Sequence, residues 1–85
     1  MRIIIRKESN NMAFIVYCIE LAKENRDKAD AILHKYYVNN DIDIKHLEYS
    51  RRGDLTTVQY WMTCTCSEDL EVIAKELRDN GIELF

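Results

Sequence analysis

The sequence has little glycine, no net positive charge and no long apolar run, and each shortage argues against a class of protein. Two glycines in 85 residues are too few for the glycine-rich loop that cradles a phosphate group. The formal net charge of −3 argues against broad nucleic-acid binding, because that affinity depends on Lys and Arg neutralising phosphates. The longest apolar run, Met12 to Ile19, is about half of the ~20 residues that a membrane-spanning helix needs.

The cysteine content favours a reducing compartment. The three cysteines are an odd number, and their spacing does not indicate the disulfide framework of a secreted domain. The sequence also lacks the small-residue cleavage pattern of a signal peptide. We therefore expect reduced thiols, a cytoplasmic protein and no membrane insertion.

The composition is that of one ordinary folded domain. Hydrophobic residues make up 47% of the chain and charged residues 32%, a balance typical of soluble globular proteins. A chain of this size buries roughly 60–65% of its unfolded surface, enough for one two-layer core. We expect a single domain over residues 1–85, with an N-terminal strand and turn in residues 1–11 and the core in residues 12–85.

The segment from Asp54 to Cys66 is predicted to be a central strand, because it is long and rich in β-branched and aromatic residues. A hairpin turn at Arg51-Arg52-Gly53-Asp54 precedes it, with Gly53 supplying a positive φ angle. An amphipathic helix from Ser67 to Asn80 follows, with Ser67 as its N-cap and Gly81 ending it.

The segment from Met12 to Leu21 has two interpretations. It is either a buried strand or the first half of one helix that runs to Tyr37, and periodicity alone does not separate them. A helix of about 27 residues would be about 40 Å long and would outgrow the second helix. We therefore favour the strand and keep the helix as the alternative.

The other segments complete the pattern. Met1 to Arg6 is predicted to be a short strand and Lys23 to Tyr37 a helix with one apolar stripe. Ile42 to Ser50 alternates like a strand, but its apolar phase slips between Ile44 and Leu47, which indicates a bulge. Ile82 to Phe85 is predicted to be a final short strand.

These elements predict an α+β fold. From residue 13 onward the order is βαββαβ, which is typical of a ferredoxin-like antiparallel sheet with two helices on one face. The first and third strands of that unit would lie at the centre. The extra N-terminal strand would pair with an edge or with a partner.

Alternation along the central strand separates a core side from an open side. Val58, Tyr60, Met62, Cys64 and Cys66 are expected to face the helices. Trp61, Gln59 and Thr63 would then lie on the opposite side, which is either solvated or covered, by the extra N-terminal segment or by another molecule. An apolar surface with a Trp is a candidate contact site, and the basic hairpin at Arg51 and Arg52 is a candidate second contact.

Other arrangements of reactive residues favour structural roles. Cys64 and Cys66, with Cys18 on a neighbouring strand, lack the four turn-borne ligands that structural zinc prefers, and we expect cysteines packed as small apolar residues. The carboxylates are expected on solvated helix faces: Glu20, Glu24, Asp27, Asp30, Glu68, Asp69 and Glu71. The sequence therefore predicts no catalytic residue, no metal site and no cofactor.

From Phe14 to Leu84 the chain resembles ACT-like regulatory domains. The resemblance lies in a hydrophobic first strand, the IDIKHLEYS strand, the long third strand and a helix entered directly at Ser67-Glu68-Asp69-Leu70. The soluble C-terminal domains of MgtC-type bacterial membrane proteins are similar. The resemblance implies small-ligand sensing or oligomerisation, but Ala22-Lys23-Glu24-Asn25 replaces the glycine that many amino-acid-binding ACT domains carry after the first strand.

We therefore expect a small non-enzymatic regulatory or protein-interaction module. It would bind a protein partner or a second copy through the open sheet face and the Arg51-Arg52 hairpin. One alternative is an ACT-like sensor of a small ligand, and another is a phage or mobile-element inhibitor of a host protein.

Overall fold

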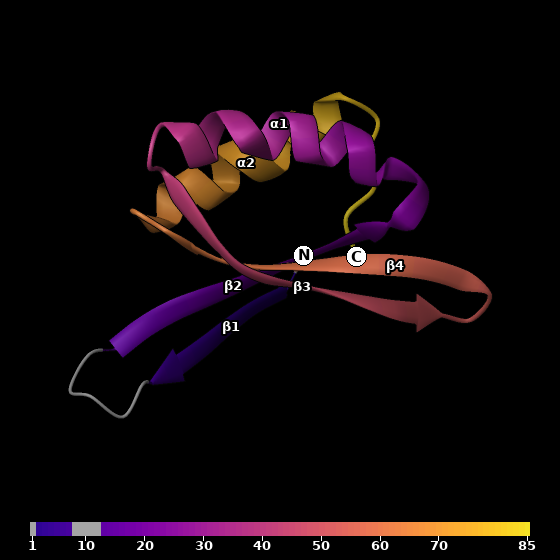
Figure 1. The fold of residues 1–85 in the computed structure, drawn as a ribbon, viewed down its shortest axis with the longest axis horizontal. Helices are drawn as coiled ribbons and strands as arrows, with labels where there is room; N and C mark the ends of the chain where they lie inside the picture. Colours follow the sequence, from indigo (N-terminus) through magenta and orange to yellow (C-terminus); the bar gives the residue numbers. More distant parts are fainter. Residues whose placement is uncertain (1, 8–12) are drawn as a thin grey trace.

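The computed structural model describes the backbone of residues 2–7 and 13–85 and the side chains of residues 16–66 and 68–85. The elements in order are β1 (Arg2–Lys7), β2 (Ala13–Ala22), the short 3-10 helix η1 (Lys23–Asn25), α1 (Arg26–Val38), β3 (Ile42–Arg52), β4 (Leu55–Cys64) and α2 (Ser67–Asp79). The strands form one antiparallel sheet in the order β1-β2-β4-β3. Both helices lie on the same side of this sheet (Figure 1). The α+β prediction is confirmed, and residues 13–22 are a strand rather than the start of a long helix.

The outer side of β2 is shared by two segments from opposite ends of the chain. The N-terminal strand β1 pairs with β2 from Arg2 opposite Cys18 to Lys7 opposite Ala13. At the other end of β2, Leu84 forms one isolated bridge with Leu21. The predicted final strand at 82–85 is therefore wrong, since β1 occupies the edge of β2 up to Cys18 and leaves only the last residues of β2. The turn predicted within residues 1–11 falls mostly outside the described residues.

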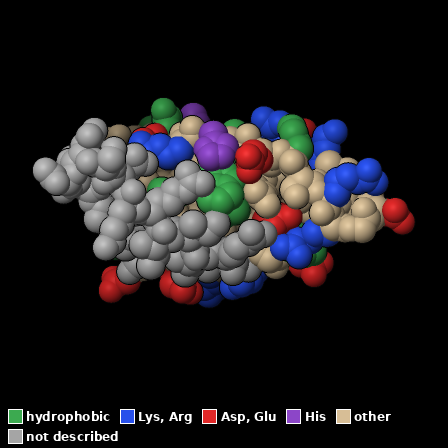
Figure 2. Space-filling model, turned by 90° about the horizontal axis from the view of Figure 1, so that it is seen from below, with side chains coloured by type: hydrophobic (Ala, Val, Ile, Leu, Met, Phe, Trp, Pro, Cys, Tyr) green, Lys and Arg blue, Asp and Glu red, His purple; other side chains and the backbone are tan. Residues whose placement is uncertain are grey.

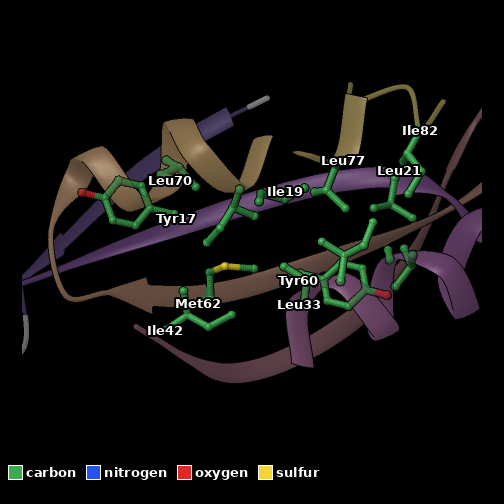
Figure 3. Close-up of a cluster of buried hydrophobic side chains, with 14 residues drawn as sticks. Tyr17, Ile19, Leu21, Leu33, Ile42, Tyr60, Met62, Leu70, Leu77 and Ile82 are labelled. Atoms are coloured by element: carbon green, nitrogen blue, oxygen red, sulfur yellow. The ribbon is translucent and has the colours of Figure 1, made fainter. Parts of the chain in front are cut away.

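The main core lies between the sheet and the two helices. In Figure 3 the side chains of β2, β4, α1 and α2 meet in this layer, with Ile82 closing one end. Helix α2 contributes Leu70, Ile73 and Leu77, spaced three and four residues apart, which is the repeat of one helical face. The expected core side of β4 is confirmed for Val58, Tyr60 and Met62, each at most 1% exposed, and Cys64 packs at the margin of the cluster.

The hairpin of β3 and β4 has the predicted irregularity. The pairing register shifts between Ile44 and His46, so Lys45 is the extra residue of a bulge. The turn is tighter than expected, because Arg51 and Arg52 belong to β3 and pair with Thr56 and Leu55. Gly53 has φ 62°, the left-handed conformation that favours glycine.

Helix α2 begins and ends with backbone contacts. Cys66, rather than Ser67, occupies the N-cap position, and its side chain makes no capping hydrogen bond. At the other end Gly81 has φ 79°, and the Ile82 N–H donates to the Leu77 carbonyl at 3.1 Å. This turn directs Ile82 into the core, where it is 1% exposed.

Candidate functional site

The side of the sheet away from the helices carries a polar row. Paired residues of neighbouring strands point to the same side, and the register places Cys18 opposite Trp61, Glu20 opposite Gln59 and Ala22 opposite Thr57. From β3, His46 pairs with Trp61 and Glu48 with Gln59. Figure 2 views the molecule from this side, where the described residues show charged side chains of both signs around a small hydrophobic area.

Glu20 is the centre of this row. Its side chain is 2% exposed, and it accepts hydrogen bonds from Arg52 Nε at 3.2 Å and Arg52 Nη2 at 3.1 Å. Thr57 Oγ1 donates to the carboxylate at 2.6 Å and Gln59 Nε2 at 3.4 Å. The Arg52 guanidinium also lies over the Phe85 ring, 5.3 Å from its centroid. The carboxylate therefore joins β2, β3 and β4 across the sheet.

The surroundings of Glu20 stabilise its charged form. Burial raises the pKa of this carboxyl, but the hydrogen bonds from Arg52, Thr57 and Gln59 and the positive charge of Arg52 lower it by more. The resulting pKa lies below its ordinary value of 4.5. The expectation of a solvated helix-face carboxylate at Glu20 is wrong, because residue 20 belongs to a central strand.

Trp61 is buried within the chain. It is 7% exposed and clusters with Val16 and Cys18. The His46 ring stacks on the indole with centroids 5.6 Å apart and an interplanar angle of 8°, and the indole Nε1–H donates to Gln59 Oε1 at 3.3 Å. The side of the sheet was predicted correctly, but the expectation of an exposed Trp61 is wrong.

Strand β3 forms the outer edge of the sheet. Among the described residues, no strand pairs with its outer side. Six of the seven residues from Asp43 to Tyr49 are exposed, and the seventh, Ile44, is half-buried. Edge strands of this length present unpaired backbone N–H and C=O groups that can accept another strand.

Exposed apolar side chains gather beside this edge. Six large hydrophobic residues of the described chain are strongly exposed, and four of them belong to α1 or β3: Tyr37, Val38, Leu47 and Tyr49. Leu47 is 40% exposed and Tyr49 54%. The Tyr49 hydroxyl accepts a hydrogen bond from Arg26, and a shallow groove of 210 Å³ follows α1 and β3, with Leu33, Tyr37 and Ile44 in its lining.

A larger groove, called the acidic groove because Asp41 and Asp43 are in its lining, lies at the start of β3. It has a volume of 520 Å³ and lies between the end of α1, the start of β3 and the end of β4. Asp41, Asp43, Tyr37, Val38 and Cys64 are part of its lining. Thr65 fixes the turn beside it, since its backbone N–H donates to the Asp41 carbonyl at 2.9 Å. The opposite end of β3 carries Arg51 and Arg52.

The five predicted contact residues have separate environments. Trp61 and Gln59 are buried and bonded to each other, whereas Thr63 is half-buried and lies in the lining of the acidic groove. Arg52 binds Glu20 and is not a free hairpin cation. Arg51 is exposed at the end of the edge strand and forms no ion pair with the described residues.

The cysteines differ in exposure. Cys18 is buried, Cys64 is half-buried and Cys66 is exposed, so the expected core position of Cys66 is wrong. Burial raises the pKa of the Cys64 thiol to about 11, and the charge of Asp69 adds to the effect. Within the described parts of the chain, no group of three His, Cys, Asp or Glu side chains is arranged to hold a metal ion.

In the part of the chain that the structure describes, no helix has the length and apolarity to cross a membrane. Comparison with family models, with curated proteins and with solved structures found no match.

Proposed function

We propose that this chain is a non-enzymatic protein-interaction module that binds an extended segment of a partner along the outer edge of β3. The observation that carries the proposal is an eleven-residue edge strand with two exposed apolar side chains, Leu47 and Tyr49, on it. An added strand would gain backbone hydrogen bonds from the edge and side-chain specificity from the apolar residues. The contact surface thus moves from Trp61 to β3, and Arg51 stays part of it.

Structural roles for Glu20, Tyr60 and Tyr36, whose pKa values are shifted, support the non-enzymatic assignment. Glu20 is bound by Arg52. The Tyr60 hydroxyl donates to Asp30 at 2.6 Å, and burial, with this bond, raises the pKa of Tyr60. The Tyr36 hydroxyl donates to Glu76 at 2.5 Å and links the two helices. These contacts stabilise the fold and need no substrate to explain them.

The fold relationship is part of the same proposal. The order β2-α1-β3-β4-α2, with β2 and β4 at the sheet centre, supports a ferredoxin-like core of the ACT-like kind. In this arrangement β1 takes most of the edge position that a final strand would hold. The odd number of cysteines and their spacing support a cytoplasmic location. An inhibitor of a host protein, including one of phage origin, would use the same edge.

A selection from a random displayed peptide library tests the proposed edge. A recovered peptide is titrated into isotope-labelled protein, and hydrogen exchange of backbone amides is measured. We expect new protection at alternate residues of β3, and binding at least about tenfold weaker in Leu47→Lys. The control is Val72→Lys, because Val72 is 55% exposed on α2. Protection confined to α2, or binding lost only in the Val72 variant, would contradict the proposal.

A small-ligand sensor is the second candidate, and the 520 Å³ groove favours it. Its lining combines apolar Tyr37 and Val38 with the carboxylates of Asp41 and Asp43, which suits a ligand with an amine and an apolar part. Thermal-shift measurements with amino acids and nucleotides test this candidate. An amine-bearing ligand should raise the melting temperature of the wild type and not of Asp41→Lys, and no shift with any ligand would reject it.

A further inference from the structure

We propose that the segment that pairs with the β3 edge is β3 of a second copy of this chain, in an antiparallel register centred on Leu47. This inference rests on the proposed function and names the partner of the same edge. In a two-fold dimer each copy offers the same surface. The β3 edge must therefore be complementary to the same edge running in the opposite direction. Three features of β3 meet this condition: the charges at its ends, the order of its central residues and the position of its bulge.

The two ends of β3 carry opposite charge. Asp41 and Asp43 lie at its start, within the acidic groove, and Arg51 and Arg52 lie at its end. Antiparallel pairing brings the end of one strand to the start of the other, so each arginine end meets the acidic end of the second copy. Charge complementarity of this kind fixes the register and speeds association.

The central residues select one register. Paired residues must share a side of the sheet, so the two-fold axis passes through a residue and not between two. An axis at Glu48 would place Glu48 against its own copy, and an axis at Tyr49 would place His46 opposite Arg52. The first brings two carboxylates together, and the second places an imidazole against a guanidinium that already binds Glu20. An axis at Leu47 places Leu47 against itself and His46 opposite Glu48 on the polar side of the sheet.

The bulge improves the match in this register. Because Lys45 is the extra residue, Ile44 falls opposite Tyr49 of the second copy instead of Ser50. Ile44 pairs with Met62 and Tyr49 with Val58, so both point to the helix side. The Tyr49 ring, 54% exposed, would then cover the apolar groove beside Ile44. A bulge often protects an edge from pairing, but here it aligns apolar residues.

The same register places the exposed Arg51 of one copy at the acidic groove of the other. Past the bulge, Ile42 falls opposite Arg51 of the second copy, beside Asp41. Arg52 is held by Glu20 within its own chain, so Arg51 supplies the contact between copies. Asp41 is the matching carboxylate, since Asp43 already binds Lys45 at 2.8 Å.

A charge exchange tests the partner and the register together. In Arg51→Glu and in Asp41→Lys, each homodimer would bring like charges together twice. An equimolar mixture would pair Glu with Lys and Arg with Asp. Light scattering and analytical ultracentrifugation should show a dissociation constant at least about tenfold higher for each variant alone, and a mixture restored to within about threefold of the wild type. The proposal would be overturned if both variants formed homodimers with the same dissociation constant as the wild type.

Disulfide trapping tests the axis. In a Cys66→Ser background, which removes the exposed thiol, Leu47→Cys should form a disulfide dimer under mild oxidation. Residues directly opposite each other have Cβ atoms about 4.5–5.5 Å apart, close to disulfide distance. The matched variant Tyr49→Cys should form far less. Efficient trapping of Tyr49→Cys alone would reject this register.

A wild-type chain that stays monomeric at high concentration would also overturn the second copy as partner. The proposed function would survive that result if a selected peptide still protected the β3 amides. It would fail separately if peptides bound elsewhere on the molecule.

Discussion

The Arg52 guanidinium donates two hydrogen bonds to the buried Glu20 carboxylate from a strand that is not adjacent to β2 in the sheet. The contact passes over β4, where Thr57 and Gln59 also donate to the same carboxylate. A charge covered in this way depends on its partners, because removing one of them leaves an uncompensated charge. The first two predictions concern this pair.

Arg52→Ala should lower the free energy of unfolding by ~1–3 kcal/mol, less than a fully buried pair would lose. The expected loss of stability is smaller than for a fully buried pair because the Arg52 side chain is 45% exposed and water replaces part of the lost contact. Urea unfolding followed by Trp61 fluorescence measures the change. The matched control is Arg51→Ala, measured where the chain is monomeric, which should change stability by less than about 0.5 kcal/mol. Equal effects of the two variants would show that the Glu20 contact adds nothing.

The contribution of Glu20 should disappear in acid. Its pKa is lower in the folded state than the ordinary value of 4.5, so the unfolded chain binds more protons in that pH range. Stability from Glu20 is therefore complete above pH 4.5 and is lost as the pH falls through the folded pKa. The difference in unfolding free energy between the wild type and Glu20→Gln should shrink from about pH 7 to about pH 3. The exposed Glu24→Gln gives the baseline, and a difference that grows in acid would contradict the assignment.

Trp61 should fluoresce as a buried indole. At 7% exposure, its emission should lie at a shorter wavelength than that of a free indole, and acrylamide should quench it weakly. Because His46 stacks on the ring, His46→Ala should increase quenching at least about twofold. The chain has two histidines, and His34→Ala on α1 provides the control. Strong quenching in the wild type would contradict the buried position.

The thiols should react in three steps with a disulfide reagent at mildly alkaline pH. Cys66 is exposed and should react first. Cys64 should follow slowly, because its pKa is raised to about 11 and little of it is thiolate. Cys18 is 0% exposed and should react only when the chain unfolds. Mass spectrometry of the labelled peptides gives the order, and early labelling of Cys18 would contradict the packing around it.

Local patterns in the sequence predicted most of the fold. Alternation along 54–66 separated the two sides of β4, and the slip between Ile44 and Leu47 located the bulge. These features depend on neighbours within one or two strands. The final strand could not be excluded in this way, because its absence depends on how far β1 extends along β2.

The candidate site was harder to predict because its contacts join distant residues. Glu20 and Arg52 are 32 positions apart, and Glu20 looked solvated as long as residues 12–21 had a helical alternative. As a strand residue in phase with Cys18, it would have been placed on the polar side. His46 helps to bury Trp61, and the two residues lie together only because the β3–β4 register pairs them. The exposed edge of β3 follows from the strand order alone.

The shared edge of β2 has a consequence for connectivity. Arg2 pairs with Cys18 and Leu84 bridges Leu21, so two segments from opposite ends of the chain meet about 10 Å apart on one strand. A short linker could join them and let new termini open at the Gly53 turn, giving a circular permutant with every strand neighbour retained. In the natural order, this edge is complete only after residues 84 and 85 have been synthesised, so β2 keeps part of its backbone unpaired until Leu84 bridges Leu21 and the Phe85 N–H donates to the Glu20 carbonyl.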